Sequence, residues 1–528
     1  MIFFINIMKK YKDIFFFFFC YLLSYFFLLI NNGIYWDDWL LYTLDKQTSI
    51  KVALDLGTGI IGFIGPVLLL FPHGFVLGKI LTFFAYFFAG IFLNCILKSI
   101  RNIDQFSRVI LVTLFMIFPV NCVRISFCVI HYAFCYFLFF FAFFLIFKYL
   151  QNKKLIFRVL ALISFFVAFF TNSFLVFYLI IILYLFYREK GTMKSLKSVF
   201  FACLKYVDFI LLPLIFWGLK IIFFVPNGYF KGTYNQITIN SFLNIGLNLK
   251  LSFRTSFFQI IKRAVLLGKD NILLIIVLSL LIFLILKIMN FKDSKVSRKY
   301  YIFGIIFGFL CFFLALFPYL VTGNIPLNQD WLPRHQLLVP LGAVLMIFYS
   351  IQLLFSFIKI NNIKIIVVSI IISLFIFANC NNYMEYYKDW FKQLALIENF
   401  KMNSKIKNGE TFILIDNAYI LNAKQRSFRY YEYMGLLQYV FPHSKRKYVF
   451  SFDDSRDPTK INNLFYYYYN KNLDSKKINR PDYIINIRQG NLKIDRKTFF
   501  DLFVLYNSNK FEFKNRIINY ICLNVQKI

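Results

Sequence analysis

Two adjacent carboxylates lie between two tryptophans where the first long apolar run ends, in the sequence Tyr35-Trp36-Asp37-Asp38-Trp39. Tryptophan favours the interface between a bilayer and water, and a carboxylate at that depth is partly desolvated. Desolvation raises the pKa of a carboxyl group and suits it to act as a general base. Asp37 and Asp38 are therefore candidate catalytic residues, and the three aromatic side chains are candidate substrate contacts.

Helix capping is an alternative role for the two acids. Asp37 or Asp38 would then cap the amphipathic segment 39–54, and the flanking tryptophans would belong to an aromatic belt. The sequence leaves both roles open.

A second group of polar side chains lies in the loop 322–336, which joins two apolar runs and contains Asp330, Arg334 and His335. An arginine binds phosphate in a bidentate manner, and a histidine adds a hydrogen-bond donor or a proton. Arg124, in the turn between two earlier apolar runs, is a further candidate phosphate ligand, and Asp330 is a candidate substrate contact. The alternative is an arginine whose stem lies along lipid, beside a histidine that starts a helix.

Turn residues open a third segment, 226–235, in which Tyr234 and Asn235 are candidate substrate contacts. The stretch 237–267 that follows is amphipathic and basic. An interfacial helix explains this pattern, and its basic groups also suit a lipid phosphate or pyrophosphate.

The elements that position these residues are membrane-spanning helices. Hydrophobic residues make up 60% of the 528-residue chain, a composition that excludes an ordinary soluble globule. A helix needs roughly 20 apolar residues to cross a bilayer. This length predicts about eleven spans, near 14–34, 76–97, 107–121, 127–149, 156–171, 173–187, 199–225, 271–289, 300–321, 336–358 and 363–383. The region 156–187 also fits one long tilted helix, and 60–72 fits a half-span.

Positive charge in the short connections predicts the orientation of these spans. Lys and Arg outnumber Asp and Glu by 59 to 25, and the basic connections alternate with nearly uncharged ones. The basic side is cytoplasmic, which places the N-terminus inside and, with an odd number of spans, the C-terminus outside. The formal charge of +34 therefore indicates topology and anionic partners such as the lipid bilayer, and nucleic acid is not an expected partner.

The chain divides into a transmembrane domain, residues 1–383, and a soluble domain, residues 384–528. After residue 383, Tyr, Lys, Asn and Asp replace Phe and Ile, and no run is long enough to span. Short β-like runs at 411–415 and 483–487 alternate with polar turns and helix-like stretches. The tail is therefore predicted to be a small extracytoplasmic α/β domain.

An acidic motif in the first external loop, many spans with the N-terminus inside and a soluble C-terminal domain outside together resemble the GT-C superfamily. Its members are membrane glycosyltransferases that use polyprenyl-phosphate sugars. The resemblance implies that Asp37 or Asp38 is a general base for an acceptor hydroxyl that attacks the anomeric carbon. Arg334, His335 and Arg124 would stabilise the departing phosphate. The acceptor would be a glycan, a lipid or a protein, and the site would lie on the extracytoplasmic face of the plasma membrane.

The resemblance has limits in its motifs and cofactors. The tail has no W-W-D-x-G-like motif, so transfer to asparagine is not expected. Some members of the superfamily use a divalent metal, but with only two clear carboxylates here neither an obligatory metal nor another cofactor is expected.

Two other classes of protein share part of this pattern. A transporter or flippase for a lipid-linked saccharide would carry charged residues at mid-membrane and helices broken in paired positions. The predicted spans are nearly free of charge, which favours chemistry at the surface. A polysaccharide polymerase or ligase would share the outward site but would depend mainly on arginines and histidines in large external loops.

Overall fold

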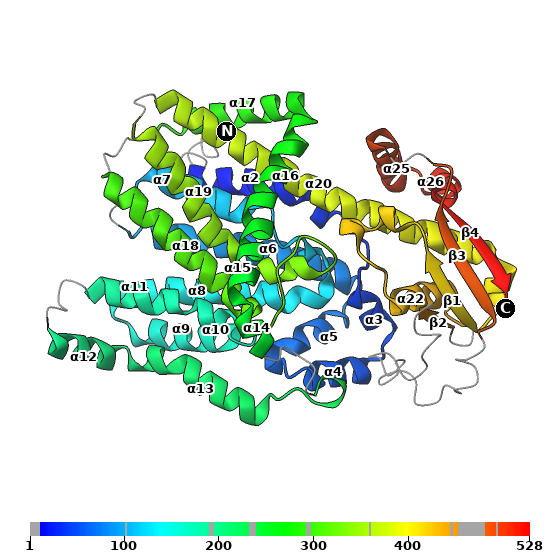
Figure 1. Ribbon diagram of the computed structural model, residues 1–528, viewed down its shortest axis with the longest axis horizontal. Helices are drawn as coiled ribbons and strands as arrows, with labels where there is room; N and C mark the ends of the chain where they lie inside the picture. Colours follow the sequence, from blue (N-terminus) through cyan, green and yellow to red (C-terminus); the bar gives the residue numbers. More distant parts are fainter. Residues whose placement is uncertain are drawn as a thin grey trace.

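Apolar helices dominate the computed structural model, which describes residues 11–100, 103–189, 195–231, 239–291, 297–357, 361–443, 447–451, 481–492 and 495–528. Figure 1 shows them side by side in one bundle, with a small sheet at one end. Five helices of the described chain are long and apolar enough to cross a membrane: α2 (Lys12–Leu29), α6 (Gly74–Leu97), α8 (Ile130–Asn152) with the turn before it, α18 (Arg298–Val321) and α20 (Asn361–Met402). The chain is therefore a multi-pass helical membrane protein.

Two bent helix pairs raise the number of candidate spans to seven if each pair crosses once. Helices α12 (Leu196–Lys205) and α13 (Val207–Phe223) meet at 59°, because Tyr206 between them leaves the helical conformation. Helices α16 (Gln259–Lys269) and α17 (Ile272–Ile288) lie on either side of a 105° bend at Asn271. The number of spans is thus five to seven by length and composition, and about eleven stays a prediction.

The other segments expected to span are also helical but shorter. They are α7 (Gln105–Ile117), α9 (Leu155–Ala168), α10 (Ser173–Phe177), α11 (Leu179–Glu189) and α19 (Val339–Phe355). The region 156–187 is therefore not one long helix, since the chain turns between α9 and α10. The region 60–72 contains only η1 (Gly59–Phe63) and α5 (Ile64–Leu68), which are too short to cross a bilayer.

Close packing in the bundle depends on small residues where backbones approach. Gly308 of α18 faces Gly342 of α19, and a Cβ atom on Gly342 would lie 2.3 Å from the backbone nitrogen of Phe312. Two helices in a membrane gain from such close contact because lipid already solvates larger apolar side chains. Either glycine therefore resists replacement by a larger residue.

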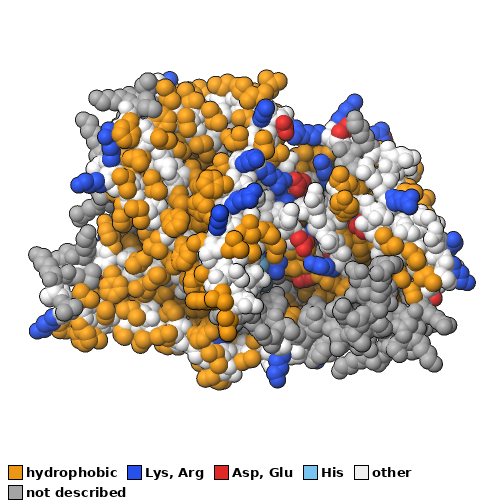
Figure 2. Space-filling view, in the orientation of Figure 1, with side chains coloured by type: hydrophobic (Ala, Val, Ile, Leu, Met, Phe, Trp, Pro, Cys, Tyr) orange, Lys and Arg blue, Asp and Glu red, His pale blue; other side chains and the backbone are white. Residues whose placement is uncertain are grey.

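Apolar side chains also cover the outside of the bundle. Leu214 on α13 and Leu273 on α17 are 67% and 76% exposed, as expected for side chains that face lipid. Figure 2 shows hydrophobic side chains over most of the helical part, whereas charged side chains gather near the C-terminal domain and at the opposite edge. The amphipathic stretch after residue 237 forms α14 (Ile239–Leu243), α15 (Ile245–Phe253), the π-helical turn η5 (Arg254–Phe258) and α16.

The C-terminal domain contains a four-stranded sheet in the order β2-β1-β3-β4. Its strands are β1 (Thr411–Asp416), β2 (Tyr448–Ser451), β3 (Tyr483–Gln489) and β4 (Ile521–Lys527). β1 pairs in parallel with β2 and β3, whereas β3 and β4 are antiparallel. Among its described residues, the domain has the helices α21 (Ser404–Asn408), α22 (Tyr430–Val440), α25 (Arg496–Ser508) and α26 (Lys510–Ile517). Both predicted strands are therefore confirmed, together with the mixed α/β character of the tail.

Helix α20 joins the bundle to this domain without a break. It runs through residue 383, where the sequence predicted a boundary, and continues to Met402. Figure 1 shows its last part lying along α22 and the sheet. The C-terminal domain is thus attached to the bundle through one continuous helix, whose first part belongs to the last apolar segment and whose last part contacts the domain.

Candidate functional site

The Trp36-Asp37-Asp38 turn begins helix α3 (Asp37–Thr43). Trp36 occupies the N-cap position, and its side chain makes no capping hydrogen bond. The next helix, α4 (Lys46–Asp55), is capped by Asp45, whose carboxylate accepts from the Thr48 N–H at 2.9 Å. Neither Asp37 nor Asp38 is therefore the N-cap of α3 or of α4.

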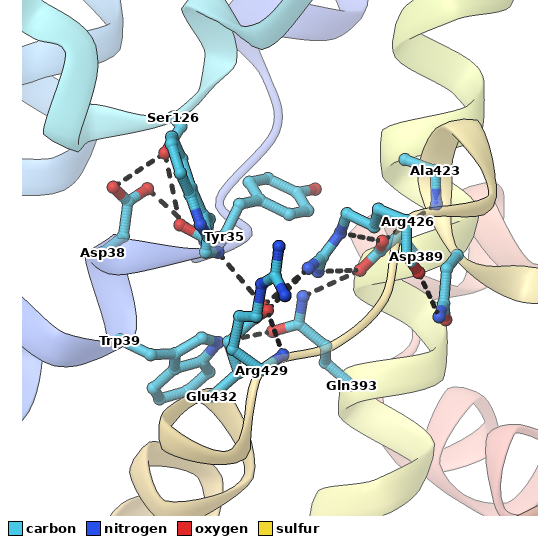
Figure 3. Close-up of polar contacts among 12 residues, drawn as sticks. Tyr35, Asp38, Trp39, Ser126, Asp389, Gln393, Ala423, Arg426, Arg429 and Glu432 are labelled. Carbon is cyan, nitrogen blue, oxygen red and sulfur yellow. Dashed lines mark hydrogen bonds and ion pairs between the residues drawn. The ribbon is translucent and has the colours of Figure 1, made fainter. Parts of the chain in front are cut away.

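The Asp38 carboxylate is fully buried and surrounded by donors. It accepts from the backbone N–H groups of Phe127 at 2.9 Å and Cys128 at 2.7 Å. It also accepts from the Ser126 hydroxyl at 2.9 Å (Figure 3). The Tyr35 N–H also points to it, at 3.4 Å. Burial raises the pKa of Asp38 to about 6, and these donors oppose the rise because they stabilise the charged form. Asp38 thus ties α3 to the turn before α8, with its oxygens already engaged.

The Asp37 carboxylate instead lines a cavity of about 800 Å³. It accepts a hydrogen bond from the Tyr431 hydroxyl. Burial raises the pKa of Asp37 to about 6, against the hydrogen bond from Tyr431, and the neighbouring Asp38 charge raises it further. Arg334 and Arg429 act in the opposite direction. A carboxylate with this pKa is mostly ionised at neutral pH and still basic enough to accept a proton.

The cavity lies where α3, α4, α5 and the start of α8 meet the C-terminal domain. Its polar lining includes Arg334, His131 and Tyr132 from the bundle. The C-terminal domain adds a run of consecutive residues, Ser427 to Tyr431. Apolar residues of α3, α4, η1, α5 and the start of α8 also line the wall, together with Phe230. A cavity of this size and mixed lining suits a small polar ligand with an apolar portion.

Arg334 reaches the cavity from the turn η6 (Leu332–Gln336). Its guanidinium donates to the Trp331 carbonyl at 2.9 Å and lies over the Trp36 ring, 5.1 Å from the ring centroid. Trp36 in turn stacks on Trp331 at 4.5 Å. The stack holds the arginine beside the turn that carries Asp37, so a carboxylate and a cation face one space.

Asp330 lies beside the cavity but does not line it. Its carboxylate pairs with the guanidinium of Arg429 at 3.3 Å. Arg429 is half exposed and lines the cavity itself. Asp330 is thus placed to orient Arg429 rather than to touch a ligand in this space.

Two predicted phosphate ligands lie away from the cavity. His335 is buried and stacks on Tyr319 at 4.7 Å between ring centroids; burial lowers its pKa to about 3, so its imidazole is neutral. Arg124 is also buried, donates to the carbonyls of Asn121 and Val120 and lies over the Tyr86 ring. Neither group lines the cavity, so neither meets a ligand there.

The remaining predicted substrate contacts divide in the same way. Trp36 lines the cavity, whereas Tyr35 and Trp39 are buried beside it. The Tyr35 hydroxyl donates to the Tyr386 carbonyl at 2.6 Å. Tyr234 and Asn235 lie outside the described residues.

A buried group of charges, missed by sequence reasoning, anchors the loop that carries Arg429. Arg426 forms ion pairs with Asp389 of α20 at 2.8 Å and with Glu432 of α22 at 2.7 Å, and all three side chains are fully buried (Figure 3). We call Asp389, Arg426 and Glu432 the buried triad. Burial raises the pKa of Glu432, while Arg426 opposes the rise.

Hydrogen bonds connect the buried triad to α3. The Trp39 indole donates to Gln393 at 2.9 Å, and the Gln393 amide donates to Asp389 at 2.9 Å. The sequence signal for this network is the string Arg426-Ser427-Phe428-Arg429-Tyr430-Tyr431-Glu432, which concentrates two arginines and a glutamate. It does not stand out in a tail so rich in Lys and Tyr.

Within the described part of the chain, no three His, Cys, Asp or Glu side chains are grouped as metal ligands. Asp37 and Asp38 point in different directions, one toward the cavity and one toward the turn before α8. The prediction of a site without an obligatory metal stays a prediction.

Comparisons of the chain with protein-family models, with curated proteins and with solved structures find no match.

Proposed function

We propose that this protein is a membrane glycosyltransferase that moves a sugar from a polyprenyl-phosphate donor to a hydroxyl group of a cell-surface acceptor. The observation that carries the proposal is that Asp37 and Arg334, which are distant in the sequence, line one cavity. A base and a phosphate-binding cation in the same space are the two groups that such a transfer needs.

In the proposed reaction, the ionised Asp37 carboxylate accepts the proton of the acceptor hydroxyl. The acceptor oxygen forms a bond to the anomeric carbon as the bond from that carbon to the phosphate oxygen breaks. The phosphate leaves with the bonding electrons, and Arg334 and Arg429 stabilise its charge. The pKa of about 6 for Asp37 supports this role, because the carboxylate is ionised at neutral pH without being a weak base.

The predicted orientation completes the proposal. About eleven crossings would place the N-terminus in the cytoplasm and the C-terminal domain outside the plasma membrane. The charge distribution supports this orientation, because Arg188 lies in the last turn of α11. Helix α11 lies at the edge of the bundle opposite the C-terminal domain (Figure 1). The cavity would then open on the extracytoplasmic side, where lipid-linked donors and surface acceptors meet.

A transfer assay in membranes that contain the full chain tests the proposal. Labelled polyprenyl-phosphate hexoses and pentoses serve as donors, and label in lipid, glycan and protein fractions is measured. We expect Asp37→Asn to reduce transfer by about 10²- to 10⁴-fold, the usual contribution of a general base. Asp45→Asn is the matched control, because asparagine also caps a helix and Asp45 is exposed.

Two outcomes would contradict different parts of the proposal. Wild-type transfer by folded Asp37→Asn protein would overturn Asp37 as the general base. Movement of lipid-linked saccharide across the membrane by the wild-type chain, with no transfer from any donor, would overturn the transferase function and indicate a flippase.

A further inference from the structure

Two consecutive residues of α22 hold two consecutive residues at the start of α3. The Tyr431 hydroxyl donates to the Asp37 carboxylate, and the Glu432 carboxylate accepts from the Trp36 N–H at 3.0 Å. One contact fixes the carboxylate and the other fixes the backbone before it. The first turn of α22 therefore holds the turn that carries Asp37, the proposed base, through two hydrogen bonds.

The backbone of this turn is strained at Trp36. Trp36 has φ 56° and ψ −129°, a conformation that a residue with a Cβ atom rarely adopts. Such a conformation is energetically costly and persists only where the surroundings hold it. Here Glu432 accepts from the Trp36 N–H, and Trp331 stacks on its ring. Holding this conformation sends the Asp37 side chain toward the cavity while Asp38 turns to the bundle.

The buried triad fixes the first turn of α22, which carries Tyr431 and Glu432. Arg426 makes two hydrogen bonds to Glu432, at 2.8 and 2.7 Å, and two to Asp389 on α20, at 2.8 and 3.0 Å. The first turn of α22 is thus fastened to a helix of the bundle. A rigid support of this kind is what a precisely oriented side chain requires.

We propose that Tyr431 is a positioning residue for Asp37, so that the C-terminal domain completes the active site instead of only shielding it. The inference rests on the proposed function. The Tyr431 hydroxyl orients the Asp37 carboxylate in the cavity and stabilises its ionised form, and it keeps its own proton throughout. Burial and the nearby Asp37 charge raise the pKa of Tyr431 well above its ordinary value, so it remains a donor at neutral pH.

The proposal predicts the direction of a pH effect. The charged and titratable groups that face Asp37 are Asp38, Cys128, Arg334, Arg429 and Tyr431. A donor to the carboxylate lowers the pKa of Asp37, so loss of the Tyr431 hydroxyl raises it above about 6. Because transfer needs the ionised carboxylate, the loss of transfer on acidification then begins at a higher pH.

The experiment measures transfer against pH for wild type, Tyr431→Phe and Tyr419→Phe. We expect the acidic limb of Tyr431→Phe to move up by about one pH unit, which lowers transfer about five-fold at pH 6 and much less at pH 8. Tyr419 is 60% exposed and does not line the cavity, so its variant keeps the wild-type profile. Thermal unfolding in detergent confirms that each variant is folded.

The outcomes separate the two proposals. An unshifted acidic limb in Tyr431→Phe, with transfer still lost in Asp37→Asn, would overturn the role of Tyr431 and leave the proposed function intact. Full transfer by Asp37→Asn would overturn Asp37 as the base. Absence of transfer by the wild-type chain from every donor would overturn the proposed function itself.

Discussion

Two groups of acids and arginines lie next to each other where the bundle meets the C-terminal domain, and they differ in how completely their charges are paired. In the buried triad, Arg426 meets two carboxylates with good geometry, and none of the three side chains is exposed. In the cavity, Asp37 accepts from one hydroxyl, and Arg334 binds only a carbonyl and a ring among the contacts described. Similar residue types therefore hold the structure together in one place and face open space in the other.

The difference explains which charges can do chemistry. A fully paired buried charge has no free edge for a ligand, and removing its partner is costly. A charge that faces a cavity can exchange its weak contacts for a substrate. The same contrast separates Asp38 from Asp37, although the two residues are adjacent.

The largest expected effect is on the buried triad. Arg426→Met leaves the Asp389 and Glu432 carboxylates buried without their cation, so we expect the free energy of unfolding to fall by about 3–5 kcal/mol. Denaturation in detergent measures the loss. The exposed pair of Arg516 and Glu512 on α26 supplies the control, because Arg516→Met costs about 0.5 kcal/mol or less.

A second variant sharpens this result. Combining Arg426→Met with Asp389→Asn and Glu432→Gln removes the uncompensated charges and restores part of the stability. If Arg426→Met were as stable as Arg516→Met, the triad would not be the anchor of α22.

The next effect is on transfer through the cavity cations. We expect Arg334→Gln to reduce transfer about 100-fold and Arg429→Gln about 10-fold, as for loss of charge stabilisation at a leaving group. Arg429 has the smaller effect because it is half exposed and already paired with Asp330. Arg488→Gln, at an exposed position of β3, keeps wild-type transfer. If all three variants transferred sugar equally well, neither Arg334 nor Arg429 would stabilise the leaving phosphate.

Much of the helical fold follows from the sequence, because runs of apolar residues leave few alternatives to helix in a bilayer. The continuation of α20 beyond residue 383 could not be predicted from the sequence, because the residues after 383 include the charges that contact the C-terminal domain. These charges include Asp389, whose partner Arg426 is brought close only by the folded loop. A change of composition therefore concealed an uninterrupted helix.

The candidate site followed from the sequence only in part. Residue types and topology predicted Asp37 and Arg334 as site residues, and both line the cavity. The choice between Asp37 and Asp38 depends on the backbone of Trp36, which no spacing rule predicts. Arg429 and Tyr431 come from a tail in which similar residues are common, so only the fold distinguishes them.

The most direct measurement compares Asp37→Asn with Asp38→Asn in both transfer and unfolding. We predict that Asp37→Asn loses transfer by about 10²- to 10⁴-fold and unfolds like wild type. Asp38→Asn should lose about 2 kcal/mol of stability, because one amide oxygen cannot accept from all of its donors, yet should retain transfer within about ten-fold per folded molecule. The opposite pattern, with transfer lost only in Asp38→Asn, would contradict the assignment of Asp37 as the base.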